Sequence, residues 1–302
     1  MPQGQPPAGR GRDAKPFRAP GGPRGDRSGR AAPRRDRDDV DDGRSLGAPT
    51  GPRVPVGLDR AKSKAGAPPR PGRDTTAPAR PQLPEDEQPQ LPKHVRRDID
   101  RVIGKNRRGA DIALALSIGA AAIDEDRIDV ALPMLAWAKH EAPRIAAVRE
   151  AYGVALYLDE QFAGALSELQ AYKRLTGRVD QNHLIADALR ALGREVDRVV
   201  DAAAELVNAD DAPEDRRAEA AIVWASALAD AGDVGAGRAV LRNFSSRHGG
   251  GDGEHLLRVA YVAAELAARD GRPDEARVEF ERILVADPDY LDVEQRLADL
   301  DG

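Results

Sequence analysis

The chain contains no cysteine, few aromatic residues and no long apolar run. Without cysteine it has no disulfide framework, no thiol nucleophile and no thiolate ligand for zinc. No stretch approaches the ~20 apolar residues that a membrane-spanning helix requires. The first residues are charged and proline-rich instead of apolar, so they do not resemble a secretory signal. We therefore expect a cytoplasmic protein that does not enter a membrane.

Proline, glycine and charge are unevenly distributed along the chain. Residues 1–92 hold 18 of the 23 prolines, 13 of the 29 glycines and one aromatic residue, Phe17. Their 18 Lys+Arg and 12 Asp+Glu give +6, whereas residues 93–302 carry 28 and 39, which gives −11, and the two sum to −5. A Pro/Gly/Arg-rich segment buries too little apolar surface to offset its ordering entropy. We predict that 1–92 form a disordered basic tail and 93–302 a folded acidic domain.

Small residues recur in the folded domain at spacings of 33 to 39 residues, at Gly119, Gly153, Ala186, Ala225 and Ala264. Twelve residues after each of these stand Ala131, Ala165, Arg198, Gly237 and Ala276, and four further on stand Leu135, Leu169, Ala202, Leu241 and Phe280. Seven residues after each small residue come Asp126, Glu160, Gly193, Gly232 and Gly271. A fixed period of this length indicates stacked repeats. Closely packed helices need Gly or Ala where they approach most closely.

Each period is predicted to form two helices joined by a turn, because the apolar spacing is helical and no segment alternates as a strand does. The predicted units are 112–145, 146–179, 179–213, 218–253 and 257–290, with a closing helix over 290–300. In the last turn, Gly271 supplies the positive φ that a helix end favours. Before the first unit, a short entry helix presents one apolar face made of Val95, Ile99, Val102 and Ile103.

The pattern resembles the tetratricopeptide repeat (TPR), whose consensus has a small residue, a turn Gly or Asp, an Ala and a large apolar residue at these offsets. The first unit matches with Gly119, Asp126, Ala131, Leu135 and Pro143. The resemblance covers about 180 residues and implies an all-α, right-handed α-solenoid of about five TPR-like helical hairpins. Three features depart from it: Arg198 in place of alanine, Pro133 inside a second helix, and five surplus residues that we assign to a loop over 245–253.

The resemblance also implies that the first helices of the units line a groove. At the equivalent positions we predict a protein-binding groove that includes Glu150, Tyr157, His183, Asp187, Arg190, Tyr261 and Glu265. Chaperone-binding members of the family carry lysine and asparagine there to clamp a terminal carboxylate, and this chain lacks that set. The predicted groove is acidic and apolar in turn, so a basic peptide would suit it better than an acidic one.

Other candidate sites are weaker. His248 and His255 flank a glycine-rich run that also holds Asp252 and Glu254, and such a set could bind a metal ion. A solvated loop is the favoured interpretation, because nothing fixes the geometry of these side chains. The same run lacks the Lys-Ser/Thr ending and the preceding strand of a nucleotide-binding loop. We predict no cofactor, no metal site and no catalytic residues.

We therefore predict a non-catalytic scaffold or adaptor that binds a protein or peptide on the concave face of the solenoid. The alternative is an RNA- or ribosome-associated factor. In that case Arg10, Arg12, Arg24 and Arg30, each beside a glycine, would hold nucleic acid while the solenoid holds a protein. The sequence leaves open the partner, the pathway, the oligomeric state and whether 179–213 is a true repeat.

Overall fold

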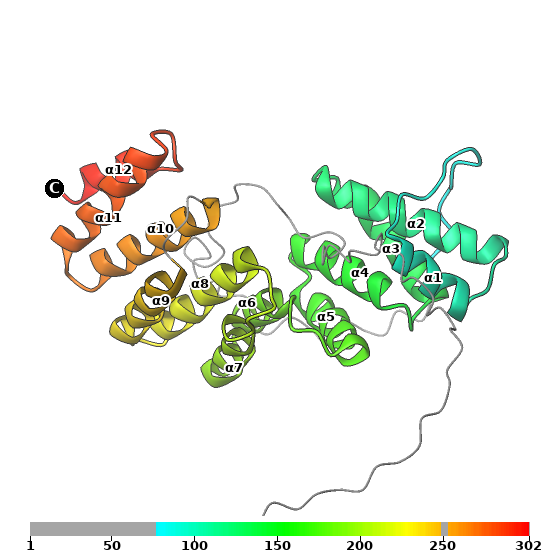
Figure 1. Ribbon diagram of the computed structural model, residues 1–302, viewed down its shortest axis with the longest axis horizontal. Coiled ribbons are helices and arrows are strands. Elements are labelled where there is room, and N and C mark those ends of the chain that lie inside the picture. Colours follow the sequence, from blue (N-terminus) through cyan, green and yellow to red (C-terminus); the bar gives the residue numbers. More distant parts are fainter. Residues whose placement is uncertain (1–76, 249–252, 302) are drawn as a thin grey trace, which may run out of the picture. The chain divides into compact units, whose positions relative to one another are not determined.

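The computed structural model describes residues 77–248 and 253–301, and this part of the chain is all-helical (Figure 1). Its helices are α1 (Lys93–Val102), α2 (Arg107–Asp124), α3 (Ile128–Glu141), α4 (Ala146–Leu158), α5 (Phe162–Thr176), α6 (Asn182–Ala191), α7 (Val196–Val207), α8 (Glu214–Asp230), α9 (Val234–His248), α10 (Glu254–Arg269), α11 (Pro273–Ala286) and α12 (Val293–Asp299). The pairs α2–α3, α4–α5, α6–α7, α8–α9 and α10–α11 pack as hairpins. They match the five predicted units, and α1 and α12 match the predicted entry and closing helices.

The small residues lie where the two helices of a hairpin approach most closely, as predicted. A Cβ added at Gly119 would lie 2.6 Å from Leu135 Cγ, and one added at Gly153 would lie 2.8 Å from Leu169 Cγ. Both leucines are completely buried. A methyl group cannot fit in that space. Glycine therefore allows the leucine of the second helix to pack directly against the backbone of the first helix.

All five hairpin turns contain a residue with left-handed backbone at the predicted position. The φ angles are 58° at Asp126, 61° at Glu160, 62° at Gly193, 99° at Gly232 and 70° at Gly271. In each turn the next residue donates its N–H to a carbonyl five residues earlier, as Arg127 does to Ala122 and Arg272 to Ala267. This is the Schellman type of helix ending. In two of the turns the left-handed residue is Asp126 or Glu160, which have a Cβ, whereas glycine would adopt the same backbone angles without strain.

The third unit is a helical hairpin with one extra residue in its turn. Its second helix, α7, begins three residues after the left-handed Gly193, whereas α3, α5, α9 and α11 begin two residues after theirs. The extra residue moves the buried positions by one, so that Val199 and Ala203 are buried while Arg198 is exposed. Arg198 therefore lies one position away from the buried site that a small residue fills in the other units.

Helix α8 joins two apolar cores. Ala220, Val223 and Ala227 belong to the core that runs from α1 to α8. Ile222 and Ala225 belong to the core that continues to α12. Because neighbouring residues on one helix serve different cores, α8 is apolar on most of its circumference, and it also contacts the flanking first helices α6 and α10.

The structure changes two predictions about loops. Residues 77–92, which the sequence assigns to the disordered tail, run as extended chain with a bend at 85–86, and Leu83 and Leu91 pack against the first core. The rest of the predicted tail, 1–76, lies outside the described residues. The surplus of the fourth unit was assigned to a loop over 245–253, but residues 245–248 continue α9, because Phe244 and Leu241 hold that face of the helix in the core.

Candidate functional site

Polar side chains on the first helices connect each unit to the next. The Tyr157 hydroxyl of α4 donates to Asp187 of α6 at 2.6 Å. Arg258 of α10 donates to Glu219 of α8 at 3.0 Å. The partners are 30 and 39 residues apart in sequence, close to one repeat, because they occupy similar positions in adjacent units.

Further contacts of this kind are Gln181–Glu150 at 2.7 Å, Arg190–Asp230 at 2.9 Å and Tyr261–Asp292 at 2.6 Å. We call this set of contacts, from α4 to the segment before α12, the polar ladder. It lies at the joints between units on the first-helix side, which the apolar core also crosses, whereas the closest contact inside the first two hairpins is apolar. The ladder and the buried groups around it are the candidate functional site.

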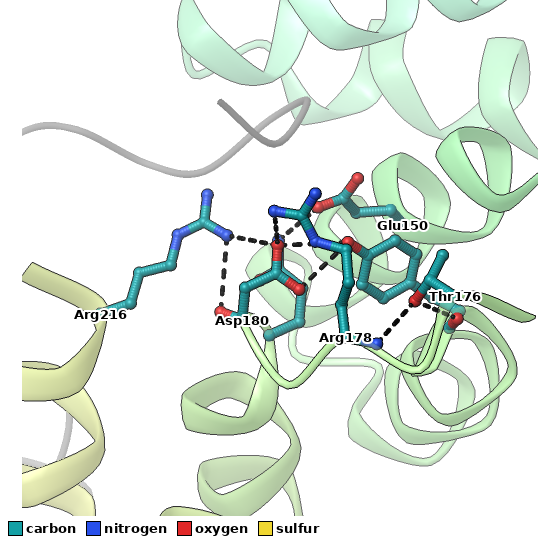
Figure 2. A network of polar contacts seen from close by, with 7 residues as sticks. Glu150, Thr176, Arg178, Asp180 and Arg216 are labelled. Carbon is teal, nitrogen blue, oxygen red and sulfur yellow. Dashed lines mark hydrogen bonds and ion pairs between the residues drawn. The ribbon is translucent and has the colours of Figure 1, made fainter. Parts of the chain in front are cut away.

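Asp180 is the central carboxylate of the site, as Figure 2 shows. It lies in the short connection before α6, and its side chain is 5% exposed. It accepts the Tyr172 hydroxyl at 3.0 Å and pairs with Arg178 at 3.0 Å and with Arg216 of α8 at 3.3 Å. Thr176 fixes the same connection, because its hydroxyl accepts the N–H of Arg178 at 3.1 Å. One carboxylate therefore joins α5, the connection and α8.

Burial sets the charge of two neighbours of Asp180. Glu150 is 4% exposed, and its removal from water raises its pKa to about 7, although the amide of Gln181 that donates to it favours the ionised form. His183 is 8% exposed, and burial together with the positive charge of Arg216 lowers its pKa to about 3. At neutral pH the imidazole is therefore uncharged, while Glu150 is close to its midpoint.

The seven predicted groove residues all lie on first helices, in two groups. The first group is on α4 and α6 and consists of Glu150, Tyr157, His183, Asp187 and Arg190. Four of these five are buried, and Arg190, with a side chain 11% exposed, pairs with the carboxylate of Asp187 at 3.0 Å.

The second group is Tyr261 and Glu265 on α10. Tyr261 is buried beside Phe280 and Tyr290, and Glu265 pairs with Arg296 of α12 at 3.4 Å. Both groups belong to contacts between helices. A bound partner would therefore contact only the small part of each of these side chains that the neighbouring helices leave exposed.

Sequence reasoning missed four charged residues of the site, Asp180, Arg216, Glu219 and Arg258. Two of their pairs, Asp180–Arg216 and Glu219–Arg258, connect residues 36 and 39 positions apart. Opposite charges separated by one repeat length are a signal that could have found them. Their burial could not have been read from the sequence, because charged residues at most such positions are solvated.

Several buried polar atoms on α6, α8 and α10 have no hydrogen-bond partner among the described residues. They include Asn182 Oδ1, His183 Nδ1, Ser226 Oγ and Arg258 Nε. Asn182 and Ser226 are each 1% exposed. Native structures satisfy nearly all buried polar groups, so these atoms mark a place where donors and acceptors become available once the side chains that cover them move.

Metal binding was considered for the histidines near the end of α9. His248 stacks on Phe244 with ring centroids 4.7 Å apart, and residues 249–252 lie outside the described part. Among the described residues, no three His, Asp or Glu side chains are arranged to hold a metal ion. In the same residues, each helix is too short or too polar to cross a bilayer.

Comparison with known proteins gives one informative likeness. No protein-family model and no curated protein matches the chain. A solved structure of a thermophilic TPR protein from Thermus thermophilus matches with a TM-score of 0.50 and 19% sequence identity. The match covers 62% of this chain and 96% of that chain. It shows a TPR-like helical-repeat fold, which agrees with the fold expected from the small-residue period.

Proposed function

We propose that this chain is a non-catalytic scaffold that binds a protein partner along the first helices α6, α8 and α10. The observation that carries the proposal is the set of buried polar atoms without partners, from Asn182, His183, Ser226 and Arg258. These atoms are enclosed by neighbouring side chains, so a partner segment reaches them once those side chains move aside. Its backbone then offers N–H and C=O groups at regular intervals, which are both kinds of partner that these atoms need.

The polar ladder supports this function by holding the first helices in place before a partner arrives. Contacts such as Tyr157–Asp187 and Arg258–Glu219 connect adjacent units, so less conformational freedom is lost on binding. The acidic groove residues already have partners, as Asp187 has in Arg190 and Glu265 has in Arg296. We therefore propose recognition by hydrogen bonds more than by net charge, and the expected preference for a basic peptide stays a prediction.

The experiment compares two serine variants of the full chain. A partner is first isolated with the wild-type protein and identified by mass spectrometry, and its dissociation constant is then measured by calorimetry. Ser226→Ala removes a buried hydroxyl that has no partner among the described residues, so we expect little loss of stability and about 3- to 10-fold weaker binding. Ser167→Ala on α5, which removes an exposed hydroxyl, is the matched control and should bind as the wild type does.

If the wild type and Ser226→Ala bind the partner with equal affinity, the partner does not bind along α6, α8 and α10 as proposed. The nucleic-acid alternative depends on Arg10, Arg12, Arg24 and Arg30, which lie outside the described residues. It predicts that RNA is captured, and that its binding falls steeply between low and physiological salt. Turnover of a substrate that is lost in a single first-helix variant would contradict the non-catalytic assignment.

A further inference from the structure

The middle of helix α2 is buried on every side, mostly by apolar residues. Six consecutive residues, 112–117, are buried, and with 3.6 residues per turn they point in every direction from the helix axis. The first repeat of a stack usually presents a polar outer face to water. Here part of the cover comes from neighbouring helices, since α2 contacts α1, α3 and α4.

The remaining cover includes the extended residues 77–92, which we call the leading segment. This segment contains the tetrapeptide Pro-Gln-Leu-Pro twice, at 81–84 and at 89–92. Both leucines, Leu83 and Leu91, are half-buried against the core to which α2 belongs. The four residues between the copies, 85–88, are exposed and turn the chain. The leading segment therefore contacts the first core twice with a leucine that has the same flanking prolines.

Two polar contacts align the leading segment with α2. The backbone N–H of Gln90 donates to the Ser117 hydroxyl at 2.8 Å, and Ser117 is itself buried. Arg80 pairs with Asp111, six residues nearer the start of α2, at 2.8 Å. The leading segment is coloured cyan in Figure 1, where it approaches α2 before it enters α1. Arg80 and Gln90 are ten residues apart, but their partners lie only about 9 Å apart along α2, so the leading segment turns back between the two contacts, at 85–88.

The leading segment is held less firmly than the helix that follows it. Helix α1 buries Val95 and Ile99 almost completely, whereas both leucines of the leading segment keep part of their surface in water. The pair Arg80–Asp111 has side chains 52% and 23% exposed, and ion pairs that are so accessible contribute little. The five prolines of the segment have no N–H, so it can leave the surface without breaking a hydrogen-bond ladder.

We propose that the α2 surface beside Asp111 and Ser117 is a binding site for extended, proline-flanked leucine segments, and that the leading segment is its built-in, displaceable occupant. The competing segment belongs to another protein and not to a second copy of this chain. A second copy would have to release its own identical segment first, so exchange between copies gains no contact. This site is separate from the proposed partner face on α6, α8 and α10.

The test uses the full chain and a labelled synthetic peptide of residues 77–92. The double variant Leu83→Ser/Leu91→Ser should release the tethered segment, and the peptide should then bind in fluorescence anisotropy. The wild type should bind it at least ~10-fold more weakly, because a tethered copy competes at an effective concentration of about millimolar. The control variant Gln82→Ser/Gln88→Ser, which changes exposed residues of the same segment, should behave as the wild type does.

Three results would overturn the proposal. The first is a folded double variant that does not bind the peptide, and the second is equal binding by the double variant and the wild type. The third is a wild-type dimer in light scattering that the double variant does not form, because it would show exchange between copies. If the double variant fails to fold, hydrogen exchange of the wild type decides. Saturating peptide should speed exchange of the Gln90 amide, which donates to Ser117, at least ~5-fold and leave α11 unchanged, and unchanged exchange at Gln90 would refute displacement.

Discussion

The closest contact inside a hairpin and the first-helix side of the joint between two hairpins differ in chemistry. Inside the hairpins, Gly119 and Gly153 receive the buried leucines Leu135 and Leu169, and the contact is apolar. At the joints, hydroxyls, carboxylates and guanidinium groups meet, as in Tyr157–Asp187. The hairpin interior repeats with little change from unit to unit, whereas each joint has its own set of partners.

The difference separates stability from specificity. Apolar contacts are non-directional, so a Gly–Leu pair would stabilise any two helices brought together at that distance. Buried charged pairs contribute little net stability, but a missing partner is costly. We therefore expect the hairpin interiors to stabilise the helices, and the joints to select which unit follows which and at what position.

The largest effect is expected at the central joint. Asp180→Ala leaves Arg216, whose side chain is 7% exposed, without its carboxylate and should lower the free energy of unfolding by about 4 kcal/mol. Asp98→Ala removes an exposed carboxylate paired with Arg101 on α1 and should cost less than about 0.5 kcal/mol. Urea unfolding followed by circular dichroism measures both, and similar losses in the two variants would contradict the distinction between buried joint and surface pair.

Next in size is an effect inside a hairpin, measured with two glycines of α9. A Cβ at Gly237 would lie 2.5 Å from the backbone oxygen of Ala225, which cannot move without displacing α8. Gly237→Ala should therefore cost about 2 kcal/mol. A Cβ at Gly235, two residues earlier in the same helix, would meet only Asp233 Oδ1 at 3.8 Å, an ordinary contact, and Gly235→Ala should stabilise the protein by about 0.5–1 kcal/mol. Thermal unfolding should show melting temperatures that change in opposite directions.

An effect of similar size depends on pH and again tests a joint. Burial raises the pKa of Glu150 to about 7 from the ordinary value of 4.5, so the folded state holds this proton more tightly than the unfolded state. The stability contributed by Glu150 is complete below pH 4.5 and is lost as the pH rises through 7. The stability of the wild type relative to Glu150→Gln should thus fall by about 2 kcal/mol between pH 5 and pH 8.

The comparison with Glu150→Gln removes the contribution of other groups that titrate in the same range. His183 acts with the opposite sign, because its pKa is lowered to about 3 and it destabilises the fold only as the pH falls. Denaturant titrations of both proteins at the two pH values provide the measurement. A constant difference between wild type and variant would show that Glu150 titrates normally.

The smallest effect is expected at a hairpin turn. Glu160 has a φ of 61°, which costs a residue with a Cβ about 1 kcal/mol relative to glycine. Glu160→Gly should therefore raise the free energy of unfolding by about 0.5–1 kcal/mol. Glu160→Ala keeps the Cβ and the strain and should show no such gain. If both variants gain equally, the carboxylate and not the backbone angle is responsible.

Much of the fold could be predicted from the sequence because hairpins are local. The spacing of Gly119, Asp126 and Leu135 places the close contact, the turn and the facing residue within 17 residues. Even the irregular third unit was visible, since Arg198 occupies a position that is small elsewhere. The sequence did not show that only the turn had lengthened, because one inserted residue and a displaced helix leave the same pattern.

Less of the candidate site could be predicted. The choice of first helices and of residues such as Tyr157 and Asp187 followed from the repeat pattern, but their burial and mutual contact did not. Asp180 and Arg216 were missed because the residues that meet at a joint are 36 positions apart and no local rule pairs them. The leading segment was assigned to the tail because its prolines exclude a helix, although its two leucines find an apolar helix to contact.

The sequence by itself determined the helices, their turns and their pairing into five hairpins, because these depend on contacts between residues close along the chain. Only the tertiary structure decided which charges are buried, which of them meet and what covers α2. Those outcomes depend on the distance between units. Interactions of charged and polar groups change from negligible to dominant over a few ångströms once water is excluded.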